Sequence, residues 1–286
     1  MTEYVTRPRR FNDIWLTEYS TENLTLSMKV KKFIHAEKTK YQELLIADTY
    51  DYGRVLMLDG AYQLTEVDEF CYSEMMSHVP LCAHENPEKV LIIGGGDGAI
   101  MREVFKHDCV KKCTLVDIDQ RVADCSKEFL PFAGKSFEDP RCDFKCMDAM
   151  KFIHETSERY DIVIVDSTDP VDFAAGLFRA DFYSDVKKIM KPGAILSELT
   201  MSPFTDKDIM QQSIKEMRKI FPAVKLYWGV VPTYPSGFWT YGVAMNNPEM
   251  NPALPVRKVN GTRYYTSEIH KSAFVLPPFL EEMINR

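Results

Sequence analysis

Two aspartates, Asp166 and Asp169, lie three residues apart in the segment IVIVDSTDP. The four apolar residues before Asp166 predict a buried strand, so we expect both carboxylates where this strand leaves the sheet. A carboxylate at that edge can bind an ammonium group and then accept its proton. The motif therefore makes Asp166 and Asp169 candidates for a chemical role at this edge of the sheet. A turn cap followed by a loop-initiating Asp-Pro pair is the simpler structural alternative.

A glycine-rich turn, residues 94–98 (GGGDG), follows the apolar segment KVLIIG and precedes a helical pattern. Glycines allow the backbone to turn tightly and to approach a ligand that a Cβ would exclude, so Gly94, Gly96 and Gly98 are expected beside a nucleotide. About twenty residues later, Asp117 ends the next predicted strand, where a carboxylate can accept hydrogen bonds from both ribose hydroxyls. This order of strand, glycine turn, helix, strand and acid predicts a nucleoside site.

The acid within the turn, Asp97, indicates which kind of nucleoside ligand to expect. A dinucleotide site holds pyrophosphate at a helix N-terminus that is free of negative charge, and Asp97 would repel that group. An acid favours a cationic ligand instead, such as an S-adenosyl sulfonium compound, over NAD or ATP. The third predicted strand ends near Asp148, which could accept from the adenine amino group or could cap the helix that follows.

The chain has two differently patterned parts. From Leu24 to about Thr65 apolar and polar residues alternate between turn signals, which predicts a small antiparallel sheet. A helical pattern follows Glu69, and beyond it short apolar strands alternate with helices, as in a parallel α/β sheet. We expect an N-terminal β-strand domain over 1–68 and an α/β domain over 69–286. The strands predicted in the second part are 89–94, 112–118, 142–146, 160–166, 194–199, 223–231 and 239–246.

Composition narrows the class of protein. The 286 residues are 45% hydrophobic and 27% charged, which is ordinary globular composition, and no apolar run has the length of a signal peptide or a membrane span. The 7 cysteines include no CxxC pair and no matching histidine cluster, so we expect reduced thiols in a cytoplasmic protein and neither a disulfide framework nor a metal site. The net charge of -7 argues against nucleic acid as a partner and is compatible with a cationic ligand.

Five segments together resemble the polyamine aminopropyltransferase family, to which spermidine synthase belongs. They are LDGAYQLTEVDEFCYSEM (58–75), VLIIGGGDGAIMREV (90–104), DSTDP (166–170), PTYPSG (232–237) and YYTSEIHKSAFVLP (264–277). The resemblance implies a Rossmann-like, methyltransferase-type sheet with a small N-terminal antiparallel β domain. It also implies transfer of a 3-aminopropyl group from decarboxylated S-adenosylmethionine, as co-substrate and without a bound cofactor or metal, to a diamine. Putrescine is the expected acceptor, giving spermidine and methylthioadenosine, and a homodimer or homotetramer is typical of the family.

The resemblance also implies roles for individual residues on the donor side. Gln42 and Asp117 are expected to contact the ribose. Asp148 with Ala149 is expected to contact the adenine, and Asp97 the aminopropyl ammonium. Ser167 and the turn glycines would lie beside the same ligand.

On the acceptor side the resemblance implies that Tyr72, Asp169 and Tyr234 orient the amine. Asp166 would then be the base that takes a proton from it. Both tyrosines would add a hydroxyl group and an apolar ring face suited to a methylene chain.

The sequence departs from the family pattern at positions that concern the acceptor. Ser73 replaces a Gln or His, Glu198 stands where a Gln is common, and Asp172-Phe173 replace a Gly-Pro pair. We therefore count Ser73 and Glu198 among the expected acceptor contacts, and additional acids would suit a longer or more basic amine. Agmatine, cadaverine, spermidine and norspermidine precursors stay open as acceptors.

Two further alternatives concern the reaction. S-adenosylmethionine itself could be the donor, which would give an aminocarboxypropyl product or, on the same scaffold, methyl transfer. Asp97 in the turn and the PTYPSG segment favour aminopropyl transfer instead. A polyamine- or nucleoside-binding regulator without turnover would be expected to lack the base, and Asp166 is present.

Overall fold

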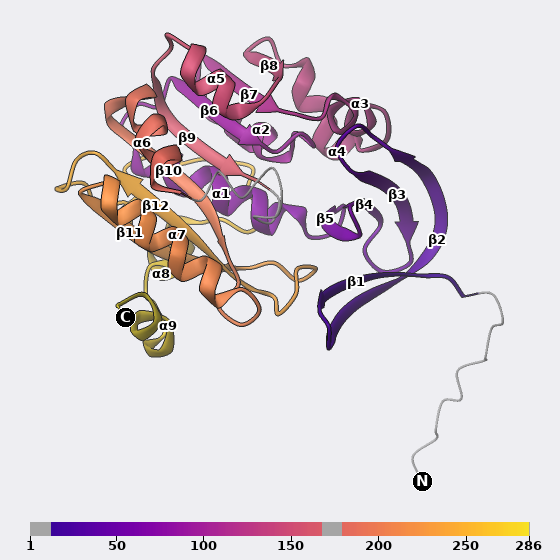
Figure 1. Ribbon diagram of the computed structural model, residues 1–286. Coiled ribbons are helices and arrows are strands. Elements are labelled where there is room, and N and C mark those ends of the chain that lie inside the picture. The colour runs from indigo at the N-terminus through magenta and orange to yellow at the C-terminus, as the bar shows by residue number, and fades with distance from the viewer. Residues whose placement is uncertain (1–12, 168–178, 286) are drawn as a thin grey trace.

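The computed structural model describes residues 13–167 and 179–285, which form two β-sheets with helices around the larger one (Figure 1). The first part comprises β1 (Trp15–Thr21), β2 (Leu24–Lys38), β3 (Glu43–Thr49), β4 (Arg54–Leu58) and β5 (Ala61–Thr65). The second part runs through α1 (Glu69–Ala83), β6 (Lys89–Gly94), α2 (Ala99–Val104), β7 (Lys112–Asp117), α3 (Gln120–Phe129), α4 (Pro131–Gly134), a 3-10 turn (Lys135–Glu138), β8 (Cys142–Cys146), α5 (Ala149–Glu155) and β9 (Tyr160–Asp166). It continues with α6 (Ala180–Ile189), β10 (Met190–Met201), α7 (Lys207–Ile220), β11 (Ala223–Val230), β12 (Phe238–Met245), α8 (Ser267–Ala273) and α9 (Pro278–Asn285).

The first sheet is antiparallel, with its strands in the order β1-β2-β3-β4-β5. Asp59 and Gly60 link β4 to β5 with left-handed backbone, at φ 48° and 82°, which is the conformation that tight hairpin turns require. The predicted antiparallel sheet is confirmed, but its predicted start at Leu24 was wrong because β1 pairs with β2 and precedes it. The β1 segment WLTEYST has few apolar residues and no fully buried one, so its sequence carries little core-facing alternation.

The larger sheet has the strand order β11-β12-β10-β9-β6-β7-β8. All neighbouring pairs are parallel except those of β12, which lies antiparallel between β10 and β11. From β6 the chain builds outward through β7 and β8 and then returns to β9 on the other side of β6. In such sheets ligands bind where the strand order reverses, outside the carboxyl ends of the strands. The predicted α/β fold of the methyltransferase type is confirmed.

Helices cover both faces of this sheet. On one face, α1 and α2 pack over a core that includes Ile162 and Ile164 of β9. On the other face, α5, α6 and α7 pack over a core that includes Val163 and Val165. Because side chains alternate along a strand, the next residue, Asp166, faces the side of α1.

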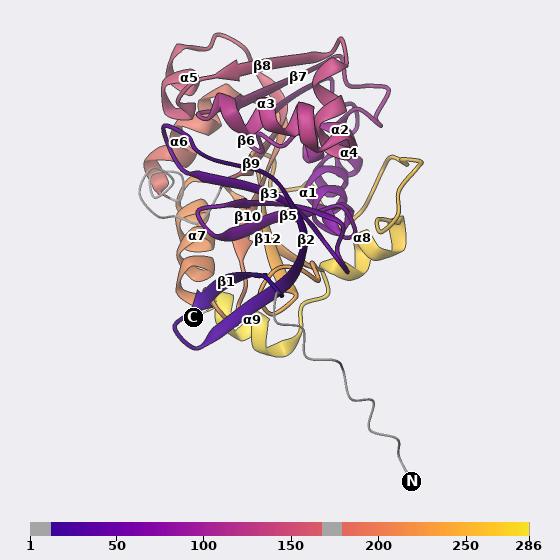
Figure 2. The ribbon, with the colours of Figure 1, turned by 90° about the vertical axis from the view of Figure 1, so that its right-hand side faces the viewer.

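The first sheet lies beside the carboxyl ends of β6 and β7 and crosses in front of the larger sheet in Figure 2. Leu56, Leu58 and Leu64 of the first sheet share a buried cluster with Ala99 of α2 and Val122 of α3. The space between the two sheets holds the site described below. The division at residues 68 and 69 into two domains stays a prediction.

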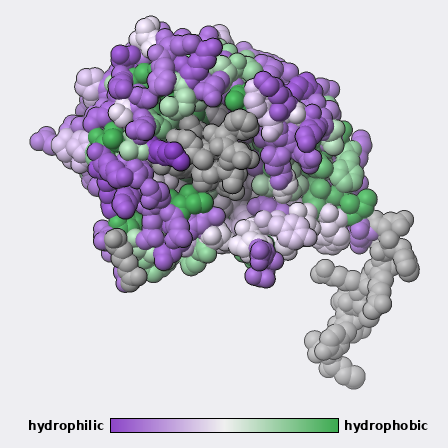
Figure 3. Space-filling view, in the orientation of Figure 1, coloured by the Kyte–Doolittle hydropathy of each residue, from purple (hydrophilic) through white to green (hydrophobic). Residues whose placement is uncertain are grey.

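The face of the molecule seen in Figure 3 is mainly hydrophilic, with separate hydrophobic spots, one of them over the first sheet at the right. None of the helices in the described part of the chain is long and apolar enough to cross a membrane.

Candidate active site

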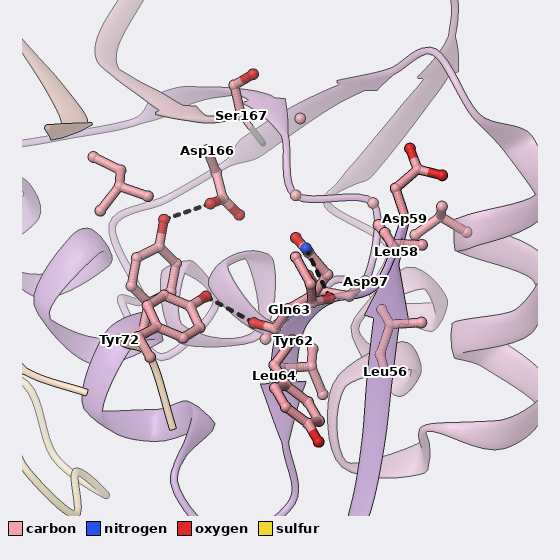
Figure 4. A pocket seen from close by; sticks show the side chains of 18 of the residues that line it. Leu56, Leu58, Asp59, Tyr62, Gln63, Leu64, Tyr72, Asp97, Asp166 and Ser167 are labelled. Atoms are coloured by element: carbon pink, nitrogen blue, oxygen red, sulfur yellow. Dashed lines mark hydrogen bonds between the residues drawn. The ribbon is translucent and has the colours of Figure 1, made fainter. Parts of the chain in front are cut away.

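A cavity of about 570 Å³ lies between the first sheet and the carboxyl ends of β6, β7 and β9. Gly94, Asp117 and Asp166, the last residues of these three strands, all line it. Figure 4 shows Asp97, Asp166 and Ser167 around the cavity with Tyr72 and residues of β4 and β5. The cavity therefore lies where the strand order of the sheet reverses. The strand-end segment with Asp166 and the glycine turn with Asp97 predicted a site at this edge.

Asp166 sits at the centre of this edge. It pairs with Gly94 across the β6–β9 register, and its Oδ1 accepts a hydrogen bond from the Tyr72 hydroxyl at 2.5 Å (Figure 4). Burial, and next to it the negative charge of Asp97, raises the pKa of Asp166 to about 7. A carboxylate with a pKa near neutrality can take a proton and release it again, which is what a general base needs.

Aromatic side chains form one wall of the cavity. Tyr72, on α1, lies with its ring centroid 5.6 Å from that of Tyr234. Tyr234 belongs to residues 231–237, here called the tyrosine loop, and its hydroxyl donates to the Gln63 carbonyl at 2.7 Å. The ring of Trp239 packs against that of Tyr234, with 4.9 Å between the ring centroids. The ring faces of this wall are apolar and the tyrosine hydroxyls are polar. Such a surface suits an aliphatic chain that ends in amines.

The glycine turn brings Asp97 to the cavity. Gly94 and Gly98 adopt φ of 80° and 85°, which L-residues rarely adopt. Oδ1 of Asp97 accepts from the Ala99 amide at 2.7 Å. Burial and, to a smaller extent, the negative charge of Glu69 raise the pKa of Asp97 to about 6, although the hydrogen bond from Ala99 lowers it.

Asp117 lies on the other side of the turn. Its Oδ2 accepts from the Gly96 amide at 3.0 Å and its Oδ1 from the Asp119 amide at 2.8 Å. Burial raises the pKa of Asp117 to about 6. A Cβ on Gly96 would lie 2.6 Å from Asp117 Oδ2, so glycine is needed for this close approach.

The other donor-side candidates also line the cavity. Gln42 does so while its amide donates to Asp119 at 3.0 Å. Asp148 and Ala149 line it next to the amino end of α5, where Oδ1 of Asp148 also accepts from the Lys151 amide at 2.9 Å. The capping role considered for Asp148 is thus present, and its position in the cavity wall leaves the ligand role open as well.

Glu198 is the candidate that the structure does not bring to the cavity. Ser197 bonds Tyr227 on the α1 face and Leu199 lines the cavity, so Glu198, between them, points to the opposite face. There it is fully buried and accepts from the Tyr183 hydroxyl of α6 at 2.7 Å. Burial raises the pKa of Glu198 well above its ordinary value. The expectation that Glu198 contacts the acceptor was therefore wrong.

Two candidates need separate mention. Ser73 lines the cavity, but its hydroxyl donates to the backbone and carboxylate of Glu69, both at 3.0 Å. Asp169 lies outside the described residues, as do Asp172 and Phe173.

The sequence analysis missed five acids of the cavity wall, which are Glu18, Asp59, Asp68, Glu69 and Asp206. Asp68 and Glu69 are nearly fully buried, and Glu69 receives two hydrogen bonds from Arg102, at 2.9 and 2.8 Å. Glu69 lies three residues before Tyr72 on α1, and Asp68 lies at the N-cap one residue earlier; this spacing was the available signal for these two acids.

Every charged residue described in the cavity wall is acidic. These residues are Glu18, Asp59, Asp68, Glu69, Asp97, Asp117, Asp148, Asp166 and Asp206. No lysine, arginine or histidine occurs among the lining residues that the structure describes. Such a wall favours cationic ligands and disfavours anionic ones.

A second cluster of titratable groups lies outside this cavity. His35, Glu37 and Cys125 bring a nitrogen, an oxygen and a sulfur within 4.8 Å of one another. Arg121 contacts the Glu37 carboxylate at 3.0 Å and the Cys125 sulfur at 3.7 Å, so the cluster already contains a cation. Burial also raises the pKa of Cys125 to about 12, which disfavours the thiolate that a metal would bind.

The fold and the cavity together define a class: a Rossmann-like α/β protein with an acidic cavity at the carboxyl edge of its sheet, which suits a cationic ligand. Residues 69–253 match the family described as the spermine/spermidine synthase domain, and residues 14–66 match the spermidine synthase tetramerisation domain. The chain belongs to this spermine/spermidine synthase family and is an aminopropyltransferase.

Individual relatives agree over nearly the whole chain. The polyamine aminopropyltransferase of Caldicellulosiruptor saccharolyticus is 43% identical over 274 residues, covering 95% of this chain and 98% of the relative. That of Bacillus subtilis is 42% identical, covering 96% and 99%.

Two solved structures are similar as well. A spermidine synthase in complex with the transition-state analogue AdoDATO has a TM-score of 0.92 at 35% identity, covering 99% of this chain and 98% of that one. The spermidine synthase of Thermotoga maritima has a TM-score of 0.90 at 35% identity, covering 97% of each chain.

Proposed function

We propose that this aminopropyltransferase moves the 3-aminopropyl group of decarboxylated S-adenosylmethionine to putrescine, giving spermidine and methylthioadenosine. The observation that carries the proposal is the acidic cavity, with its nine carboxylates and no basic residue in the described wall. Both substrates are cationic, the donor through its sulfonium and ammonium and the acceptor through its two amines.

The same charge pattern supports the choice of donor. Intact S-adenosylmethionine differs from the decarboxylated compound by one carboxylate beside the terminal amine. With Asp97 holding that amine, the additional carboxylate would lie next to Asp97 and would meet no lysine or arginine of the described wall. Asp117 with Gln42 is proposed for the ribose and Asp148 with Ala149 for the adenine, with Ser167 and the turn glycines alongside.

The reaction step needs little beyond placement and a base. The sulfonium already activates the donor carbon, so the amine nitrogen can form its bond to that carbon as the carbon–sulfur bond breaks and methylthioadenosine leaves. An aliphatic amine has a pKa near 10.4, and uncovering its lone pair at pH 7 costs about 4–5 kcal/mol. Asp166 is proposed to accept that proton, and Tyr72, Tyr234 and Asp169 to hold the amine at attack distance, which lowers the entropic barrier.

Assembly and location are part of the same proposal. Trp15, Tyr19, Leu24 and Phe33 are exposed on the first sheet, by 54%, 74%, 44% and 46%. Such side chains commonly become buried between subunits, so we propose a homodimer or homotetramer that assembles through this sheet. We also propose a cytoplasmic location, which suits seven free thiols.

A product assay tests the proposal. The purified chain would be incubated with decarboxylated or intact S-adenosylmethionine against putrescine, cadaverine, agmatine and spermidine, and products would be identified by mass spectrometry. Formation of spermidine and methylthioadenosine from the decarboxylated donor and putrescine is expected, with little turnover of the intact donor. Methylated amines, carboxylated products or a strong preference for another amine would contradict it.

A further inference from the structure

A buried carboxylate at the start of α1 does not serve its own helix. Asp68 directly precedes α1, where an aspartate usually accepts a hydrogen bond from an amide of the first turn. Its side chain makes no such bond, although only 4% of its surface is exposed. A buried carboxylate requires hydrogen-bond donors, and Asp68 finds them in two other segments.

Asp68 connects β5 to the tyrosine loop. Its Oδ1 accepts from the Thr65 hydroxyl at 2.7 Å. Its Oδ2 accepts from both the amide and the hydroxyl of Thr233, at 2.8 and 2.7 Å. Thr233 directly precedes Tyr234, whose hydroxyl is held by the Gln63 carbonyl. The short segment from Gln63 to Asp68 therefore fixes Tyr234 at its ring end and at its backbone end.

The same helix carries the other half of the aromatic wall. Asp68 occupies the N-cap position of α1, one helical turn before Tyr72. Tyr72 contacts the ring of Tyr234 and donates to Asp166. The bonds of Asp68 to Thr233 thus set the position of Tyr234 relative to both Tyr72 and Asp166.

We propose that Asp68 is a positioning residue for the acceptor: through Thr233 it holds Tyr234 at the distance from Asp166 that selects the amine's chain length. The inference rests on the proposed function, in which Tyr72, Tyr234 and Asp166 bind the acceptor. Asp68 is one of the nine acids of the cavity wall, but in this account it acts on the amine through Thr233 and Tyr234.

Asp68→Asn tests the inference because it keeps the size of the side chain while replacing one acceptor oxygen by an amide donor. Hydrogen bonds to a charged group are among the stronger ones, so the KM for putrescine should rise about ten- to a hundred-fold. Both kcat at saturating amine and the Kd of methylthioadenosine should stay within about threefold, since the base and the donor side are untouched. The preference for putrescine over propane-1,3-diamine and cadaverine should become flatter.

Two substitutions at Thr233 complete the test and do not require Asp68 to change. Thr233→Val removes only the hydroxyl bond and should give a smaller rise in KM, whereas Thr233→Ser keeps both bonds and should restore the wild-type value. A purely structural role would lower the melting temperature and depress turnover of all three diamines alike, and that result would overturn the inference. An unchanged KM in both Asp68→Asn and Thr233→Val would overturn it too. If the wild-type enzyme used no diamine, the proposed function itself would fail.

Discussion

The Tyr72 hydroxyl and the Asp166 carboxylate form a 2.5 Å hydrogen bond across the cavity, from the face of α1 to the end of β9. The bond joins the aromatic wall to the proposed base. It also stabilises the ionised form of Asp166, because a donor favours the charged carboxylate, and so it opposes the rise in pKa that burial causes.

Removing this donor should change the pH dependence of the reaction. In Tyr72→Phe the pKa of Asp166 should lie higher than in the wild type, where it is about 7. The acidic limb of kcat/KM for the amine should therefore move to higher pH, in addition to any loss of amine affinity. Steady-state rates between about pH 5.5 and 9 measure the shift. A limb that stays in place or moves to lower pH contradicts this coupling.

The buried aspartates with raised pKa values should also contribute less to the stability of the free enzyme as pH increases. Asp97, Asp117 and Asp166 have pKa values of about 6, 6 and 7, above the value of an unfolded aspartate. Between about pH 4 and 7 these three carboxyls therefore bind more protons in the folded chain than in the unfolded chain, and their contribution to the free energy of unfolding falls as pH rises.

Asp166→Asn removes one of these buried charges and should raise the melting temperature of the free enzyme by about 2–6 °C at pH 8. The difference should shrink toward about pH 5, where Asp166 is protonated in the folded wild type. Thermal unfolding of both proteins across this range is the measurement. A pH-independent difference would mean that the stability change has another cause.

Gly96 allows Asp117 to approach the glycine turn, so Gly96→Ala should weaken donor binding. The new Cβ would meet the Asp117 carboxylate at 2.6 Å and displace it. We expect the Kd of methylthioadenosine, measured by calorimetry, to rise about ten- to a hundred-fold through loss of charge-assisted hydrogen bonds. Gly193→Ala is the matched control, because its Cβ would meet nothing closer than 3.9 Å. Equal donor affinity in the two variants would contradict the role of the turn.

Glu198 is a residue at which we expect substitution to leave activity unchanged. Because it points to α6 and away from the cavity, Glu198→Gln should keep kcat/KM within about twofold for every amine tested. The substitution is nearly isosteric and leaves an oxygen that can accept from Tyr183. A large change in the choice of acceptor, with an unchanged melting temperature, would return Glu198 to the acceptor site.

The same residue shows why part of the site could not be predicted. Strands β8 and β9 occur over the predicted residues because each is an apolar or alternating run between polar turns. Placement of Asp97, Asp117 and Asp166 in one cavity followed from strand ends in a parallel sheet. The face on which a residue lies depends on parity along the strand, however, and a shift of one residue reverses it. Glu198 and its neighbour Leu199 therefore point to opposite faces of β10.

Other contacts depend on tertiary packing that local patterns do not encode. Asp68 has the sequence position of a helix cap, yet it bonds Thr233, which is 165 residues away. Gln42 reaches the cavity because the first sheet packs against α3, where its amide meets Asp119. Neither contact has a signature in the nearby sequence, whereas the glycine turn and the strand-end acids do.

The central claim is that Asp166 takes the proton from the attacking amine, and the single-turnover rate of Asp166→Asn as a function of pH tests it most directly. At neutral pH the variant should be slower than the wild type by about 10²–10⁴-fold, while it still binds methylthioadenosine. Its rate should then climb steadily toward about pH 10 as the solvent deprotonates the amine, whereas the wild-type rate levels off at lower pH. A variant with near-normal rate at neutral pH, or with a profile parallel to that of the wild type, would contradict the claim.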